Sequence, residues 1–193
     1  ILGPEHLEVA STLNNLASLC KAKGSFQEAI QLYQRSLAIK EKALADDDPS
    51  IAISLNNLAT LYFSQGKYGE VESLCRRSLG IIEKSKGLNH TDLAPTLNNL
   101  AVLYGTLRRF SDAESLYRRA LQILETAYGQ DHVSVAPSIE NLGNLHRSQG
   151  NYEEAKRLCV RELTIKEKNL GSDHPDVTVR VGNVDALSYL QGK

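Results

Sequence analysis

Apolar residues recur along the chain with the spacing of a helix face. Near the N-terminus, Leu13, Leu16, Ala17 and Cys20 stand at positions i, i+3, i+4 and i+7. At ~100° per residue, this spacing places them on one side of a helix. A second segment with the same spacing follows after a short turn, and no stretch alternates strictly between apolar and polar residues as a half-buried strand does. The pattern therefore predicts an all-α fold.

The two-helix pattern repeats every 42 residues. The segment 13–17 reads LNNLA, and it returns unchanged at 55–59 and 97–101, with altered copies at 139–143 and 181–185. A fixed period of about 20 to 50 residues is typical of stacked repeats, in which each unit buries its apolar face against its neighbours. We therefore expect a single array over residues 1–193 that presents a binding surface and no catalytic pocket.

The period also sets the expected boundaries. Complete repeats are expected at 7–48, 49–90, 91–132 and 133–174, followed by a half repeat at 175–193. First helices are expected at 7–22, 49–64, 91–106, 133–148 and 175–190, and second helices at 26–43, 68–85, 110–127 and 152–169. The chain has no initiator methionine and starts inside the pattern, so we expect it to belong to a longer protein.

The turn between the two helices of a repeat carries a glycine in three repeats. Gly24, Gly66 and Gly150 stand there, and glycine permits the left-handed backbone that ends a helix. Arg108 holds this position in the third repeat. We therefore expect the third turn to be either strained or built differently.

The repeats resemble those of a known family. Their framework consists of Leu16, Ala17, Gly24, Phe26, Ala29 and Tyr33 and resembles the tetratricopeptide repeat. The 42-residue form is similar to the repeats of kinesin light chains and nephrocystin-3-like proteins, with the LNNLA segment, residues 117–121 (YRRAL) and the linker 171–175 (GSDHP) as its marks. The resemblance implies a right-handed superhelical solenoid of antiparallel helix hairpins, whose first helices line a concave groove.

The side of each first helix opposite the apolar face is neutral. In the second repeat it carries Ile53, Asn57, Thr60 and Ser64, whereas an ordinary solvated face would carry Lys and Glu. An amide can donate to and accept from a peptide backbone at once. The resemblance implies that the asparagines at this position hold a ligand's main chain: Asn15, Asn57, Asn99 and Asn141. Alternatively, each Asn bridges adjacent helices, and the sequence leaves both roles open.

Residues beside these asparagines differ from repeat to repeat. They are Lys21, Phe63, Gly105 and Arg147, and such variation is what selective binding of ligand side chains needs, although it also fits simple tolerance. We expect the space beside Phe63, which is flanked by Gly105 in the next repeat, to take an apolar side chain. Lys21 and Arg147 should favour acidic residues near the two ends of the ligand.

Charge and motifs exclude several classes of function. The 22 Lys and Arg nearly balance the 23 Asp and Glu, so no strong field favours nucleic acid or an anionic membrane. No apolar run approaches the ~20 residues of a membrane span, so we expect no membrane insertion. The nucleotide-binding, metalloprotease and serine hydrolase motifs are absent from the sequence, and we expect neither an enzyme nor a cofactor.

We therefore expect a non-catalytic scaffold that binds a protein or peptide ligand in its groove, as kinesin light chain arrays bind cargo adaptors. The alternative is a sensor or oligomerisation region of a larger signalling NTPase. Coiled-coil heptads upstream would favour the first interpretation, and a P-loop upstream would favour the second. The helix expected at 175–190 has no partner helix, which suggests self-association through its apolar face.

Histidines and cysteines are interpreted as structural. His6, His90, His132 and His174 each precede an expected first helix, and Asp48 takes that place in the second repeat. Packed helices lie ~8–10 Å apart, so histidines of successive repeats are too distant to share a zinc ion. The three cysteines show no metal-binding spacing, and we expect them to be buried thiols in a reducing cytoplasm.

Overall fold

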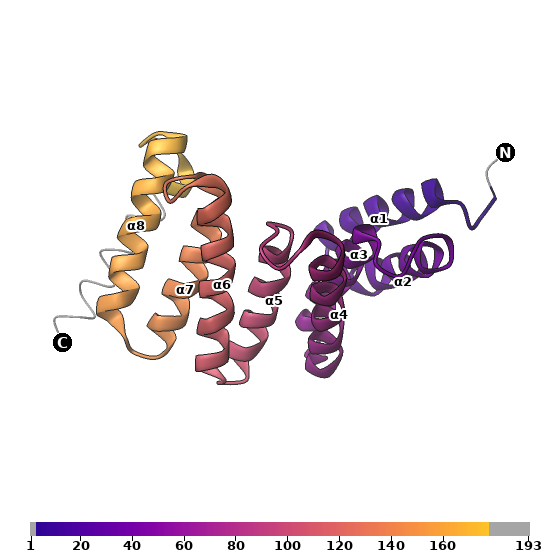
Figure 1. The fold of residues 1–193 in the computed structure, drawn as a ribbon, viewed down its shortest axis with the longest axis horizontal. Helices are drawn as coiled ribbons and strands as arrows, with labels where there is room; N and C mark the ends of the chain where they lie inside the picture. The colour runs from indigo at the N-terminus through magenta and orange to yellow at the C-terminus, as the bar shows by residue number, and fades with distance from the viewer. Residues whose placement is uncertain (1–2, 178–193) are drawn as a thin grey trace. The chain divides into compact units, whose positions relative to one another are not determined.

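The computed structural model describes residues 3–177, and every regular element in this range is a helix (Figure 1). The α-helices are α1 (Leu7–Ala22), α2 (Phe26–Ala43), α3 (Pro49–Ser64), α4 (Tyr68–Lys86), α5 (Leu93–Thr106), α6 (Phe110–Tyr128), α7 (Ala136–Ser148) and α8 (Tyr152–Leu170), and a 3-10 turn, η1 (Val133–Val135), precedes α7. The described range ends in a further helical turn at 175–177, and the rest of the helix expected at 175–190 lies outside it. The predicted all-α fold is confirmed.

The helices form two compact units that meet at Leu103 and Tyr104, within α5. In the first unit, α1 packs against α2, and α3 packs against both α2 and α4. In the second unit, α7 packs against α6 and α8. The turns between paired helices are short, so neighbouring helices run antiparallel. Each unit is thus built from helix hairpins, as the 42-residue period predicts.

The turns within the hairpins share a left-handed residue. The backbone φ is 80° at Gly24, 71° at Gly66 and 78° at Gly150. Arg108 adopts the same conformation with φ 61°, which makes it the one non-glycine residue with positive φ in the part of the chain that the structure describes. Of the two possibilities for the third turn, the structure therefore shows the strained one. The guanidinium of Arg108 lies 5.7 Å from the ring centre of Phe110.

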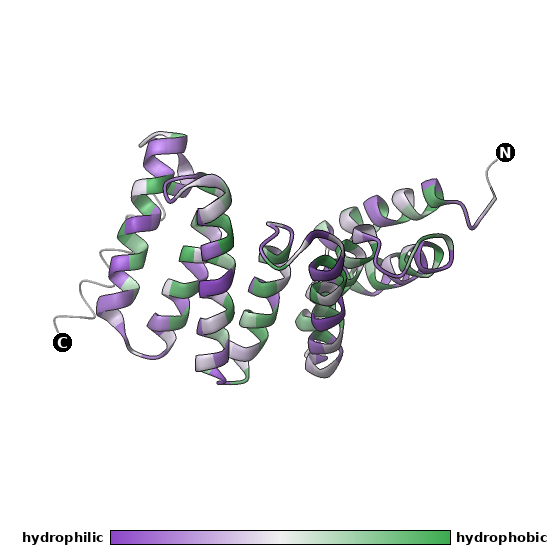
Figure 2. Ribbon diagram, viewed as in Figure 1, coloured by the Kyte–Doolittle hydropathy of each residue, from purple (hydrophilic) through white to green (hydrophobic). Residues whose placement is uncertain are grey.

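Residues at the apolar positions of the first helices form the interior. Leu58, Leu100 and Leu142 hold equivalent positions in three repeats and are 3–4% exposed. Leu16 holds the same position in α1 but is 43% exposed. Within the described residues α3 lies between neighbours on both sides, packing against α2 and α4 and bonding to α1 and α5, whereas α1 begins the described helices and packs against α2. Hydrophobic and hydrophilic residues are accordingly interleaved along each helix (Figure 2).

A side chain shortly before each first helix caps the start of that helix or of the turn that leads into it. The Nδ1 atoms of His6, His90, His132 and His174 each accept a hydrogen bond of 3.2 Å from the backbone N–H two residues later. The Oδ1 atom of Asp48 accepts the equivalent bond from the backbone N–H of Ser50 at 2.8 Å. A side-chain acceptor here satisfies an N–H that the helix itself leaves unpaired. The structural interpretation of these residues is therefore confirmed.

Ion pairs at a constant spacing link the segment before a first helix to the second helix of the same hairpin. The Nζ atoms of Lys42, Lys84 and Lys168 lie 2.8 to 2.9 Å from carboxylate oxygens of Glu5, Asp47 and Asp131, each 37 residues earlier. All are exposed, and an exposed pair contributes at most about 1 kcal/mol.

The three cysteines are free and buried, as expected. Burial raises the pKa of the Cys75 thiol to about 12. Within residues 3–177, no group of three or more His, Cys, Asp or Glu side chains is placed to hold a metal ion. The described helices include none with both the length and the apolarity that a bilayer crossing requires.

Candidate functional site

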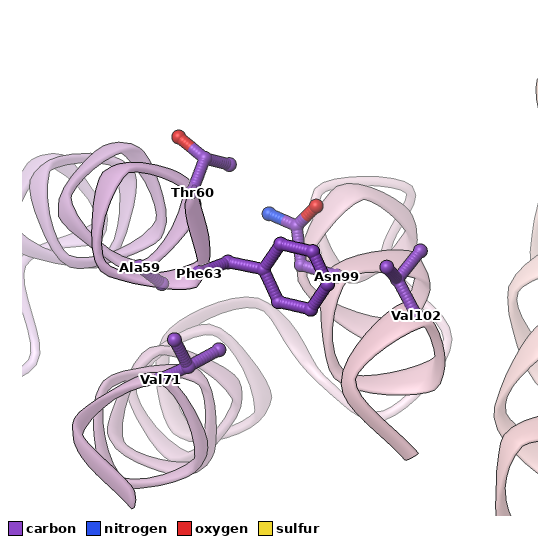
Figure 3. A pocket seen from close by; sticks show the side chains of 6 residues that line it. All are labelled: Ala59, Thr60, Phe63, Val71, Asn99 and Val102. Atoms are coloured by element: carbon purple, nitrogen blue, oxygen red, sulfur yellow. The ribbon is translucent and has the colours of Figure 1, made fainter. Parts of the chain in front are cut away.

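A trough lies between α3 and α5 in the first unit and contains two hollows. The first, which we name the Phe63 hollow, has a volume of about 80 Å³. It is lined by Ala59, Thr60 and Phe63 of α3, Val71 of α4, and Asn99 and Val102 of α5. Figure 3 shows the ring of Phe63 extending from α3 towards Asn99, with Val71 on the neighbouring α4. The walls are mostly hydrocarbon, so the hollow suits an apolar group.

The second hollow, which we name the Ile53 hollow, lies towards the N-terminal ends of α3 and α5 and has a volume of about 320 Å³. Its lining includes Ile53 and Asn57 of α3, Ile82 of α4 and Pro95 of α5. Ile53 is 57% exposed, so its side chain is accessible to a ligand in this hollow. The charged side chain in the lining, Asp92, pairs with Lys86. This hollow is therefore also essentially neutral.

Asparagine amides connect the first helices of the first unit. The Nδ2 atom of Asn57 donates to Oδ1 of Asn14 at 3.4 Å, and Nδ2 of Asn99 donates to Oδ1 of Asn56 at 2.8 Å. The inter-helix bridge that the sequence left open is thus formed. Among residues 3–177, the Oδ1 atoms of Asn57 and Asn99 accept no hydrogen bond. Both amides consequently bridge two helices and still offer a carbonyl oxygen.

One more predicted residue of the first unit reaches the trough. The Nζ atom of Lys21 donates to Oγ1 of Thr60, which lines the Phe63 hollow, at 3.2 Å. Lys21 forms no ion pair with a described residue. The structure thus brings Lys21, Phe63, Asn57 and Asn99 to one trough. Asn15 is exposed on α1, and its side chain has no hydrogen bond within the described range.

The other predicted residues belong to the second unit. Asn141 is half-buried and Arg147 is exposed on α7, and neither side chain forms a hydrogen bond or ion pair within the described range. A Cβ atom placed on Gly105 would lie 3.4 Å from Cδ1 of Leu145. The space beside Gly105 is therefore occupied by a side chain of α7. Gly105 allows close packing at that point.

Sequence reasoning did not identify the acceptors of the asparagine bridges. Asn14 and Asn56 are the first asparagines of their LNNLA segments, whereas the expected binding residues are the second. Adjacent residues on a helix point about 100° apart, and in α3 this directs Asn57 to α1 and Asn56 to α5, while both still line the Ile53 hollow. The doubled asparagine was the available sign that each first helix can bond to the first helix on either side of it.

Comparison with known proteins agrees with this architecture. The tetratricopeptide repeat family matches residues 1–42, 50–126 and 135–176. BtubC (BKLC) from P. vanneervenii has a crystal structure similar to this chain, with a TM-score of 0.83 and 26% identity, covering 96% of this chain and 74% of its own. A search of curated protein sequences gives no significant match.

A kinesin light chain-like protein of Podosopora anserina with nearly identical TPR-like repeats is also similar in fold. Its crystal structure has a TM-score of 0.79 and 24% identity, covering 97% of this chain and 89% of its own. A single-residue variant of that protein has a TM-score of 0.80 and 23% identity, covering 100% of this chain and 90% of its own. A fold of this kind supports a general function as a protein–protein interaction scaffold. Helix hairpins with a 42-residue period, left-handed hairpin turns and matches over most of the sequence together show that this chain belongs to the tetratricopeptide repeat family.

Proposed function

We propose that the α3–α5 trough binds an extended peptide segment of a protein partner, in the manner of cargo or adaptor recognition by kinesin light chains. The observation that carries this proposal is the Phe63 hollow, an apolar cavity with an amide on its wall. An apolar ligand side chain would enter the hollow. The Oδ1 atom of Asn99 would accept a backbone N–H of the ligand.

The neutral lining supports a peptide ligand. Desolvating a charged wall would cost free energy that a peptide could recover only with an opposite charge in good geometry. The Phe63 hollow has no charged lining residue, and in the Ile53 hollow Asp92 already pairs with Lys86. Burial of apolar surface therefore supplies the affinity, and the amides fix the path of the main chain.

Lys21 adds a charge preference at one end of the trough. Its ammonium group touches Thr60 at the edge of the Phe63 hollow and forms no ion pair with a described carboxylate. An acidic ligand residue next to the apolar side chain in the Phe63 hollow would form an ion pair with Lys21. Added salt should weaken such a contact, because the lysine is exposed.

A peptide-library selection against the purified chain tests the proposal. Phe63→Ala should weaken binding of a selected peptide by about 1–2 kcal/mol, roughly tenfold, because a central aromatic wall is lost. Phe26→Ala on α2 is the matched control, since Phe26 is an exposed aromatic residue of the same unit that does not line either hollow. Failure to select any peptide, or an equal loss in both variants, would refute the proposal.

A further inference from the structure

The two hollows define a spacing for any ligand that fills both. Ile53 lines one hollow and Thr60 the other, and these residues stand seven positions apart in α3. Pro95 and Val102 stand in the same relation in α5. Seven residues are about two helical turns, so equivalent points of the hollows lie ~10.5 Å apart along the trough.

This spacing restricts the backbone conformation of the ligand. In a β-strand, side chains two residues apart share a face but lie only ~6.6 Å apart, and side chains three residues apart point to opposite faces. A polyproline II segment has three residues per turn and rises ~3.1 Å per residue, so positions i and i+3 share a side at ~9.3 Å. An α-helix offers positions i and i+7 at ~10.5 Å. Polyproline II and helical ligands therefore match the spacing, and a strand does not.

Each hollow has an amide in its lining, Asn57 in one and Asn99 in the other, and these amides distinguish a polyproline II ligand from a helical one. The Oδ1 atoms of Asn57 and Asn99 accept no hydrogen bond from residues 3–177, so both are available to accept one from a ligand that displaces water from the trough. An α-helix uses its backbone N–H groups internally, whereas a polyproline II segment has no internal hydrogen bonds and leaves its non-proline N–H groups available. The amides therefore favour polyproline II.

Charge complementarity points to a neutral ligand. The lining of the two hollows contains one charged side chain, Asp92, and Lys86 pairs with it. A charged ligand residue inside either hollow would lose its hydration without gaining a partner there, because Lys21 lies outside both linings. The residues that enter the hollows should accordingly be apolar and uncharged.

We infer that the α3–α5 trough binds a polyproline II segment of a partner protein, with uncharged apolar side chains at positions i and i+3 in the two hollows. The inference rests on the proposed function and specifies its ligand. A non-proline residue between the two apolar positions supplies the N–H for an Asn oxygen.

Fluorescence anisotropy with synthetic peptides tests the inference. The first probe is an uncharged proline-rich peptide with the core Leu-Pro-Ala-Leu, and the second has the same composition with its leucines two residues apart. The third is a helix-forming peptide with leucines seven residues apart. The first should bind at least about tenfold more tightly than the others, since only it fills both hollows while offering a free N–H.

Substitutions then locate the bound peptide. Ile53→Glu places a charge in one hollow and should weaken the Leu-Pro-Ala-Leu peptide at least about tenfold. Val160→Glu is the control, because Val160 is 42% exposed on α8 and does not line the trough. Both proteins should keep the circular dichroism of the parent chain.

Equal affinity for the two proline-rich peptides, or tighter binding of the helical one, would overturn the inference. If library-selected peptides bind while the Leu-Pro-Ala-Leu peptide does not, the inference fails and the proposed function stands. If neither binds, the proposed function fails with it.

Discussion

Arg108 adopts a backbone conformation that is unfavourable for its residue type. It occupies a left-handed turn that glycine fills in three other repeats. A side chain in this region costs roughly 1–2 kcal/mol, and the contact with Phe110 recovers part of that cost. The packing of the two helices therefore imposes the left-handed turn even where the sequence has arginine in place of glycine.

Arg108→Gly should therefore raise the free energy of unfolding by about 0.5 kcal/mol, the net of relieved strain and the greater unfolded-state freedom of glycine. Gly66→Ala, at the equivalent turn, should lower it by about 1 kcal/mol. Chemical denaturation measures both. Destabilisation by Arg108→Gly would contradict the assignment of strain to this turn.

Lys40 is a charged residue in an apolar position. It is 9% exposed, and its Nζ atom donates to the carbonyl of Ser50 at 3.0 Å and to Oγ of Ser54 at 2.8 Å. Desolvation lowers its pKa below the usual 10.5, and Asp48 opposes this shift. Ile82 holds the equivalent position in the next repeat and is buried, so an apolar side chain fits there.

Lys40→Met should raise stability at neutral pH, because the folded state disfavours the charged lysine. A lowered folded-state pKa means that the unfolded chain binds more protons, so the penalty is complete below that pKa and fades as pH rises through 10.5. The stability difference between Lys40→Met and the parent should shrink accordingly in denaturation series at increasing pH. A difference that grows with pH would contradict this interpretation.

At the scale of the helix, burial depends on the neighbours that cover a position. Leu100→Ala should cost about 2–5 kcal/mol, because Leu100 is 3% exposed and its removal leaves a cavity. Leu16→Ala removes the same atoms from the same repeat position in α1, where 43% of the residue is exposed, and should cost clearly less. Equal losses in urea denaturation would show that position in the stack does not set stability.

The helices were predictable, and the hollows were not. The 42-residue period and the glycine turns locate α1 to α4 within a residue or two of the structure, because local spacing alone decides them. The face of Asn57 and Asn99 was also predictable. The bridge to Asn14 depends on how closely α1 and α3 approach each other, and the bridge to Asn56 and the Ile53 hollow depend on the approach of α3 and α5. No residue pattern encodes these distances.

At the scale of the whole molecule, the sequence predicts a single array over residues 1–193, and this stays a prediction. The described residues form two compact units that divide within α5. Self-association through the helix expected at 175–190 also stays a prediction, since that helix lies largely outside the described residues. The family and the fold support a general function of the molecule as a protein–protein interaction scaffold.

The central claim is that amides which join neighbouring helices also bind the ligand. Asn14→Ala removes the acceptor of the Asn57 bridge and leaves the Asn57 amide in place, so it should lower the unfolding midpoint without changing affinity. This variant is the control for the decisive comparison.

The most direct test measures the dissociation constant of a library-selected peptide and the unfolding midpoint on the same Asn99→Ala protein. Loss of the 2.8 Å bond to Asn56 should lower stability by about 1 kcal/mol. Loss of the Oδ1 acceptor should also weaken binding by about 1–3 kcal/mol among the folded molecules. A lower midpoint with unchanged affinity would show that Asn99 only bridges helices, and would contradict the account.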